Sequence, residues 1–246
     1  MSFVVTVYVP EAIVMASDSR QFITVEGKDS GGKPFKIETV SSDASYKTFL
    51  LERHGVGINS FGNSLLGGIS IESHVRRFSE EKLREGDDAA AVAEKLVANV
   101  KAKFTDADTH FHVAGFNKDG LASVPHVYYC HVGRNEVRRK NVGPDDDEVQ
   151  YGATWGGQPD VMSRLVNATH VRGDDGQSQE IRRSPIIWDA MNVQDAIDFA
   201  IYAVRTTIDT MRFEARAKTV DGQIDVLLLT PSGPSWVQKK GLHGQT

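Results

Sequence analysis

The N-terminal segment predicts a β-hairpin, which constrains the fold of this chain more than any other stretch. An apolar run, Phe3–Val9, ends at Pro10-Glu11, and a second run returns as Ala12–Ala16. Two such runs separated by a short turn signal are typical of antiparallel strands. Pairing of these strands would bring Asp18, just after the second run, back beside Ser2 at the start of the first.

Ser2 makes this hairpin a candidate active site. Removal of Met1 would leave Ser2 with a hydroxyl nucleophile and a free α-amine on the same residue. The ordinary pKa of an α-amine, about 7.7 to 8.0, suits a general base near neutral pH. The small side chain of Ser2 favours removal of Met1, although the sequence leaves open whether removal takes place. A carboxylate at Asp18 could orient a neighbouring cation.

The end of the hairpin carries a family resemblance. Met15-Ala16-Ser17-Asp18-Ser19-Arg20 resembles the small-apolar-Ala-Ser/Thr-Asp/Glu-x-Arg pattern of proteasome β-subunits, a branch of the N-terminal nucleophile (Ntn) hydrolases. By this resemblance Ser2 takes the place of the terminal threonine of the family, and Asp18 takes the place of its usual acid. Serine in place of threonine keeps the hydroxyl nucleophile.

A lysine downstream extends the resemblance. Tyr46–Leu51 followed by Gly55–Asn63 looks like the lysine-bearing strand of the family and the strand after it, so Lys47 is the best match to the catalytic lysine. An ammonium beside the hydroxyl would favour the developing alkoxide. The segment 21–45 offers three other lysines, which lack the flanking strand: Lys28, Lys33 and Lys36.

The segment 151–159 resembles the loop where active subunits carry a serine within a Gly-Ser-Gly turn. Trp155 and Gly156 stand at that place here, and Thr154 could supply a substitute hydroxyl. Gly156 and Gly157 would let backbone amides point at a substrate oxygen. We therefore expect Thr154, Gly156 and Gly157 to form the oxyanion and substrate loop.

The C-terminal part carries two further, weaker matches. The segment 222–229 looks like the Gly-x-Ile-Asp-Val strand of the family. The run Asp209–Arg212 resembles a motif of the bacterial Anbu-type proteasome relatives, and the nearest relatives implied are of the Anbu and HslV types. Asp209 is the candidate for the second acid, and a solvated aspartate in the last turn of a helix is an equal alternative.

Composition agrees with one soluble domain over residues 1–246. Hydrophobic residues make up 40% of the chain and charged residues 25%, which is ordinary for a globular protein. The formal charge of −5 offers no basic face, so we expect no nucleic-acid binding. Cys130 is the single cysteine, is expected to be a buried thiol, and suits a reducing compartment. Without an apolar run long enough to span a bilayer, we expect a cytoplasmic protein.

Hydrophobic periodicity predicts the remaining elements. A helix capped by Asn192 and running to about residue 211 is the clearest amphipathic segment. Two polar stretches, 21–45 and 169–191, are predicted to be surface excursions. Strands are expected at 47–51, 56–60, 110–116, 124–132, 136–142, 224–229 and 235–239, and helices at 63–80, 87–103, 158–168 and 192–211. The element order fits the α+β class, and the resemblance implies a four-layer αββα sandwich of two antiparallel sheets flanked by helices.

Competing chemical motifs are weak. His110 and His112 lie on one face of a predicted strand, but two imidazoles need further ligands to hold a metal, so ordinary strand histidines are expected. The acidic run Asp145–Asp147 is expected to be solvated. Neither Gly67-Gly68 nor Gly156-Gly157 belongs to a phosphate-binding signature. We therefore predict no metal and no cofactor.

The resemblance implies amide hydrolysis by Ser2 through an acyl-enzyme, with Lys47 and Asp18 in support. Its implied partners are a peptide or unfolded-protein substrate, further copies of the chain in a ring or stacked assembly, and an unfoldase. Two alternatives stay open: a non-catalytic scaffold or assembly subunit of the same fold, and an Ntn amidase that acts on a small amide.

Overall fold

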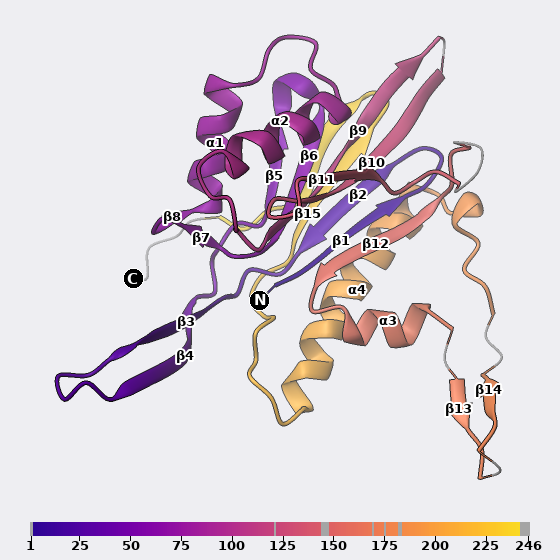
Figure 1. Ribbon diagram of the computed structural model, residues 1–246. Coiled ribbons are helices and arrows are strands. Elements are labelled where there is room, and N and C mark those ends of the chain that lie inside the picture. Colours follow the sequence, from indigo (N-terminus) through magenta and orange to yellow (C-terminus); the bar gives the residue numbers. More distant parts are fainter. Residues whose placement is uncertain are drawn as a thin grey trace.

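The computed structural model describes residues 2–120, 122–143, 148–168, 170–174, 176–181 and 184–241. The protein is of the α+β class and is built on two five-stranded antiparallel sheets (Figure 1). The expected acidic run at 145–147 lies outside the described residues. No helix in the described ranges is long and apolar enough to cross a membrane.

The first sheet contains the N-terminal hairpin. Its strand order is β12-β1-β2-β15-β16, and every neighbouring pair is antiparallel. The strands are β1 (Phe3–Tyr8), β2 (Ile13–Ser17), β12 (Gly152–Gly157), β15 (Asp225–Thr230) and β16 (Gly233–Gln238). Val4 pairs with Ser17, and the Asp18 N–H donates to the Phe3 carbonyl, 3.2 Å away. The hairpin predicted from the sequence is confirmed, and it returns Asp18 to the start of β1.

The second sheet has the order β11-β10-β9-β6-β5, and it is also fully antiparallel. Its strands are β5 (Thr48–Leu51), β6 (Val56–Gly62), β9 (Thr109–Asp119), β10 (Ala122–His131) and β11 (Glu136–Arg139). The two sheets contact each other through β1 and β2 on one side and β5 and β6 on the other. Gly57 allows this close approach, because a Cβ there would lie 2.4 Å from the Met15 sulfur.

Helices cover the outer face of each sheet. They are α1 (Ile71–Glu81), α2 (Ala89–Lys101), α3 (Asp160–Val166) and α4 (Val193–Phe213). Helix α2 packs on β9 and β10, whereas α4 packs on β1, β2 and β15. Figure 1 shows α1 and α2 on one side of the sheets and α3 and α4 on the other. The expected cap of α4 is confirmed: Asn192 and Asp195 form a reciprocal capping box.

Strand β1 is apolar along almost its whole length because both of its faces are buried. Phe3, Val5 and Val7 face the core under α4, while Thr6 and Tyr8 face the other sheet. A half-exposed strand would show polar residues at every second position, and β1 does not.

The helix expected over 63–80 begins later than predicted. Helix α1 starts at Ile71, capped by the Ser70 side chain, and a small hairpin of β7 (Leu65–Leu66) and β8 (Ile69–Ser70) precedes it. The turn between these strands is Gly67-Gly68, and both glycines have positive φ. An L-residue helix cannot pass through two such positions, which is why the prediction was wrong at this end.

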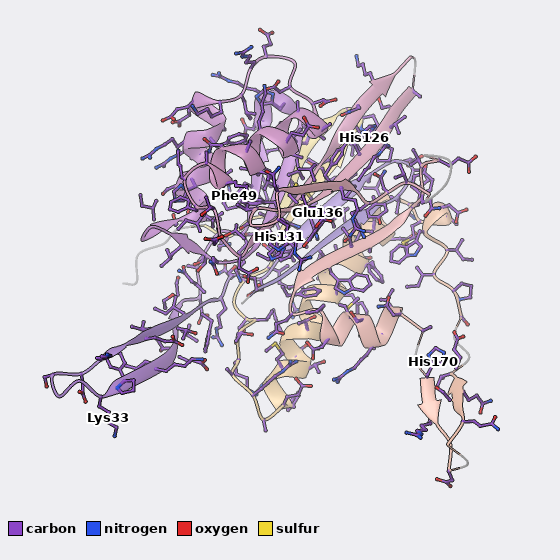
Figure 2. The ribbon with its side chains drawn as sticks, in the orientation of Figure 1. Lys33, Phe49, His126, His131, Glu136 and His170 are labelled. Carbon is purple, nitrogen blue, oxygen red and sulfur yellow. The ribbon has the colours of Figure 1, made fainter. Side chains whose placement is uncertain are left out.

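The two polar excursions contain hairpins of their own. The first, within 21–45, pairs β3 (Gln21–Lys28) with β4 (Pro34–Ser42) around a turn organised by the Asp29 carboxylate. Figure 2 shows Lys33 near the tip of this arm, away from the two large sheets. The second, within 169–191, pairs β13 (His170–Arg172) with β14 (Ser178–Glu180) before a short 3₁₀ turn at Trp188–Ala190. The described residues of β13 and β14 are exposed, as expected for surface excursions.

Candidate active site

Ser2 is held by its backbone at the start of β1. The Gln158 N–H donates to the Ser2 carbonyl over 2.8 Å, and the Ser2 residue is 5% exposed. Gly157 lies directly against it, because a Cβ at Gly157 would come within 1.8 Å of the Ser2 carbonyl oxygen. The φ of Gly157 is +91°, a backbone conformation that favours glycine. Gly157 therefore fixes the position of Ser2 through a close backbone approach.

Asp18 is fully buried and accepts four hydrogen bonds. Its Oδ1 accepts from the Phe3 N–H at 2.8 Å and from Lys47 Nζ at 2.7 Å. Its Oδ2 accepts from the N–H groups of Arg20, at 3.0 Å, and Asp221, at 3.2 Å. One ammonium and three backbone dipoles thus compensate a carboxylate that has lost its contact with water.

Lys47 forms the ion pair with Asp18 that the resemblance implies. Its Nζ also donates to the Arg20 carbonyl over 2.6 Å, and the residue is 4% exposed. Burial lowers the pKa of Lys47 below its usual range, and the Asp18 charge opposes that shift. A buried ammonium with a lowered pKa releases its proton more readily than a surface lysine.

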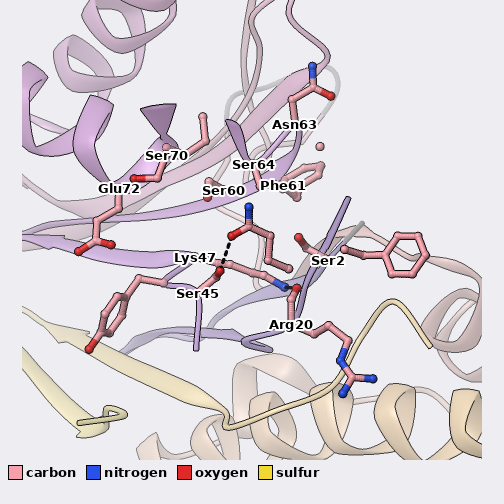
Figure 3. Close-up of a pocket in the computed structure, with 15 residues that line it drawn as sticks. Ser2, Arg20, Ser45, Lys47, Ser60, Phe61, Asn63, Ser64, Ser70 and Glu72 are labelled. Carbon is pink, nitrogen blue, oxygen red and sulfur yellow. Dashed lines mark hydrogen bonds between the residues drawn. The ribbon is translucent and has the colours of Figure 1, made fainter. Parts of the chain in front are cut away.

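Ser2 and Lys47 line the same open pocket, drawn in Figure 3. Its other walls come from the start of β3, the end of β6 and the first turn of α1. Ser45 and Gln21 close one side through a side-chain hydrogen bond of 2.6 Å. The remaining lining residues are Arg20, Phe22, Tyr46, Ser60, Phe61, Gly62, Asn63, Ser64, Ser70, Ile71 and Glu72.

Asp221 is a residue of this neighbourhood that the sequence analysis missed. Its N–H meets Asp18, and its carboxylate pairs with Arg20, which also pairs with Asp43 at 2.6 Å. Gly222 makes the turn possible: its φ is +88°, and a Cβ there would lie 2.8 Å from the Asp43 carbonyl. The Asp221-Gly222 dipeptide just before β15 was the available signal, since such pairs mark tight turns.

Two expected site residues do not reach this pocket. Thr154 lies in β12 opposite Thr6, so about 10 Å of strand separates it from Gly157. Asp209 is exposed on α4 and does not line the pocket. The family resemblance implied a loop at Thr154, whereas the chain forms strand β12 there.

Gly156 and Gly157 lie beside β1 and not in the pocket wall. Gly156 pairs with Val4, and a Cβ there would overlap the Phe61 ring at 2.4 Å. Gly62 is the glycine that lines the pocket with Ser2. Its φ is +91°, and a Cβ at Gly62 would lie 2.2 Å from the Asp108 carbonyl.

A buried polar network joins the two sheets next to the ion pair. The Thr48 hydroxyl donates to Ser17 Oγ at 2.8 Å or to Asn59 Oδ1 at 2.7 Å, and the Asn59 amide donates to the Val5 carbonyl. Its last member is His112. The Nδ1 of His112 lies 3.2 Å from Thr6 Oγ1, and burial lowers the pKa of His112 to about 3.

Cys130 and His110 do not belong to this network. Cys130 is buried, as expected, and burial raises the pKa of its thiol to about 12, so it is not a reactive thiolate at neutral pH. His110, which the sequence grouped with His112, instead contacts Asp108 and Tyr129. Both rings lie on the same face of β9 and contact the Phe61 ring, but His112 is buried beside Thr6, whereas His110 lies at the Asp108 end of the strand.

Comparison with known proteins assigns this chain to no family. No protein-family model matches the sequence, and a search of curated proteins finds no match either. The geometry alone shows a serine and a buried lysine that line one pocket, with a buried carboxylate paired to that lysine. Such a set can activate a hydroxyl and stabilise negative charge that develops beside it.

Proposed function

We propose that this protein is a proteasome-like Ntn hydrolase that cleaves amide bonds through Ser2 after removal of Met1. The observation that carries the proposal is the buried ion pair between Lys47 and Asp18 at the pocket that Ser2 also lines. Buried charge is costly, and enzymes concentrate it where a shifted pKa serves the chemistry.

The packing of the elements supports the fold that this proposal requires. Helices lie outside two antiparallel sheets, and the sheets face each other. We assign this arrangement to the four-layer αββα sandwich of the Ntn hydrolases. In that fold the nucleophile stands at the start of a central strand, which is the position of Ser2 before β1.

The proposed reaction uses Ser2, Lys47 and Asp18. Ser2 Oγ attacks the amide carbonyl while the Ser2 α-amine takes the hydroxyl proton and later returns it to the leaving amine. Lys47 stabilises the developing alkoxide, and Asp18 holds Lys47 in position. We expect the oxyanion to lie against the pocket wall at Gly62, and not against Gly156 and Gly157. Water then hydrolyses the ester.

The resemblance also supplies the proposed partners. A peptide or an unfolded protein would be the substrate, and copies of the chain would assemble into a ring or stacked particle, with an unfoldase as a possible partner. The mass of the particle in solution, measured by light scattering, tests the assembly directly. A monomer at micromolar concentration would contradict it.

The decisive test combines intact mass with covalent labelling. Loss of Met1, seen as a mass lower by one methionine, should accompany acylation of Ser2 by a peptide β-lactone probe. We expect one adduct per chain on the N-terminal peptide, none in Ser2→Ala, and undiminished labelling in Ser235→Ala, which removes an exposed hydroxyl on β16. Equal labelling of Ser2→Ala, or no labelling of chains that have lost Met1, would overturn the proposal.

A non-catalytic scaffold subunit is the second candidate. It is favoured by the two supporting side chains that the pocket lacks, since Thr154 pairs with Thr6 and Asp209 is exposed on α4. Full retention of Met1 would bury the α-amine of Ser2 in a peptide bond and would select this alternative. Turnover of small amides without turnover of peptides would select an amidase.

A further inference from the structure

A cluster of three metal-ligating side chains lies outside the Ser2 pocket. Asp108 immediately precedes β9 and His110 is the second residue of that strand, while His131 ends the neighbouring strand β10, directly opposite His110. One potential ligand atom from each residue lies within 4.8 Å of the other two. Figure 2 labels His131 at this end of β10, while His126 lies further along the same strand.

Both ring nitrogens of His110 have a polar partner, and without a metal the Tyr129 hydroxyl can donate to Nδ1 while Nε2–H donates to Asp108. The Nδ1 of His110 lies 2.9 Å from the Tyr129 hydroxyl, and its Nε2 lies 2.9 Å from Asp108 Oδ1. If Nδ1–H donates to the hydroxyl of Tyr129, a neutral imidazole presents a lone pair at Nε2 to a carboxylate, which also has only lone pairs. A cation between Nε2 and Oδ1 removes that repulsion. Tyr129 would then fix the tautomer, as groups behind metal-binding histidines do.

His131 supplies the second imidazole. Its ring lies 4.2 Å, centroid to centroid, from the ring of His110. The buried Nδ1 of His131 has no hydrogen-bond partner among the residues that the structure describes. The ligand atoms of His110 and His131 therefore lie close enough for one ion to bind both, and neutral imidazole is the form of histidine that binds metals.

We propose that Asp108, His110 and His131 bind one divalent transition-metal ion, with zinc as the matching probe. Imidazole nitrogen and carboxylate oxygen are ordinary zinc ligands, and a solvent molecule would complete four-coordination. Tetrahedral bonds of about 2.0 to 2.1 Å place ligand atoms about 3.3 Å apart, so Asp108 Oδ1 and His110 Nε2, now 2.9 Å apart, must separate slightly, and more distant ligand atoms must approach. The Asp108 side chain is 74% exposed and can make that adjustment.

The cluster also adjoins the wall of the Ser2 pocket. Phe61 lines that pocket, and its ring stacks on His110 at 5.0 Å with an angle of 10° between the planes. A metal bound to His110 would therefore fix the ring against which Phe61 stacks. The binding site itself does not depend on whether Ser2 is catalytic.

The test is calorimetric titration of the full, tag-free chain with zinc chloride. We expect one zinc ion per chain, an affinity lowered at least tenfold by Asp108→Asn and by His131→Ala, and unchanged affinity in His126→Ala. His126 is the matched control, because it lies on the same strand with its Nδ1 3.0 Å from the Tyr128 hydroxyl. Zinc should also raise the melting temperature of the wild type and of His126→Ala, but not that of His131→Ala.

Two results would overturn the assignment. The first is the absence of saturable zinc binding to the wild type. The second is equal affinity in the wild type, Asp108→Asn and His131→Ala. Because the Asp108 side chain is largely exposed, Asp108→Asn should fold normally, and its melting temperature without zinc verifies that. Failure of this test would leave acylation of Ser2 unaffected, so the two proposals stand or fall separately.

Discussion

The layer between the two sheets differs from one end to the other. Near the β1–β2 turn it is apolar, and its buried members come from both sheets: Tyr8, Ile13, Met15, Ala114, Val127, Leu227 and Leu229. Near Ser2 the equivalent positions carry polar side chains, which are just as buried: Thr6, Ser17, Thr48, Asn59 and His112. The ion pair of Asp18 and Lys47 lies beyond them.

This difference shows that burial did not decide the residue types in this layer. An apolar filling would have been simpler at both ends, because buried polar groups cost free energy unless each finds a partner. Here Thr48 reaches Ser17 and Asn59, and Asn59 reaches the Val5 carbonyl. Proteins keep such costly groups chiefly at functional sites, which agrees with a site at the Ser2 end.

The largest expected effect is on the charged end. Lys47→Met should lower the free energy of unfolding by about 3 to 5 kcal/mol, because it leaves the buried Asp18 carboxylate without its cation. Urea denaturation followed by circular dichroism measures the change. The matched control is Lys95→Met, which breaks a Lys–Asp pair of similar length at the surface and should have a small effect. Equal effects of the two variants would contradict the buried-pair interpretation.

A smaller effect is expected at the apolar end. Met15→Ala should cost about 3 kcal/mol, because it leaves a cavity between the sheets where Met15 packs against Gly57. Val25→Ala, at an exposed position on the β3–β4 arm, should change stability by less than about 0.5 kcal/mol. Chemical denaturation of both variants provides the comparison, and similar midpoints would mean that the sheets do not pack as described.

The smallest effect depends on pH and belongs to the polar end. Burial lowers the pKa of His112 to about 3, so between about pH 6.5 and pH 3 the unfolded chain binds a proton at His112 that the folded chain does not. The stability contributed by the neutral ring is complete above pH 6.5 and falls as the pH drops below it. At pH 5 the loss from this one group is about 2 kcal/mol.

Replacing the imidazole should flatten that pH dependence. Between pH 7 and pH 4 the free energy of unfolding of the wild type should fall more steeply than that of His112→Asn. His170→Asn, at an exposed position on β13, should follow the wild type. Denaturation at a series of pH values measures these slopes. Parallel curves for the wild type and His112→Asn would show that His112 is not buried in its neutral form.

Prediction from the sequence succeeded where the signal was contiguous. The turn at Pro10-Glu11 and the flanking apolar runs predicted β1 and β2, and Asn192 marked the start of α4. It failed at α1 because Gly67-Gly68 turns the chain before the helix can begin. In the candidate site the family pattern indicated Asp18 and Lys47, which do form an ion pair.

The remaining features depend on which strands became neighbours. The sequence determined the hairpin, the cap of α4 and the buried fate of Cys130, because each depends on residues close together in the chain. Only the tertiary structure shows that Asp221 contacts Asp18 and that His131 lies opposite His110. It also shows that Thr154 and Asp209 lie away from the pocket. Strand order and register determine such contacts. Both depend on the free energy of the whole core, which a local sequence pattern does not reveal.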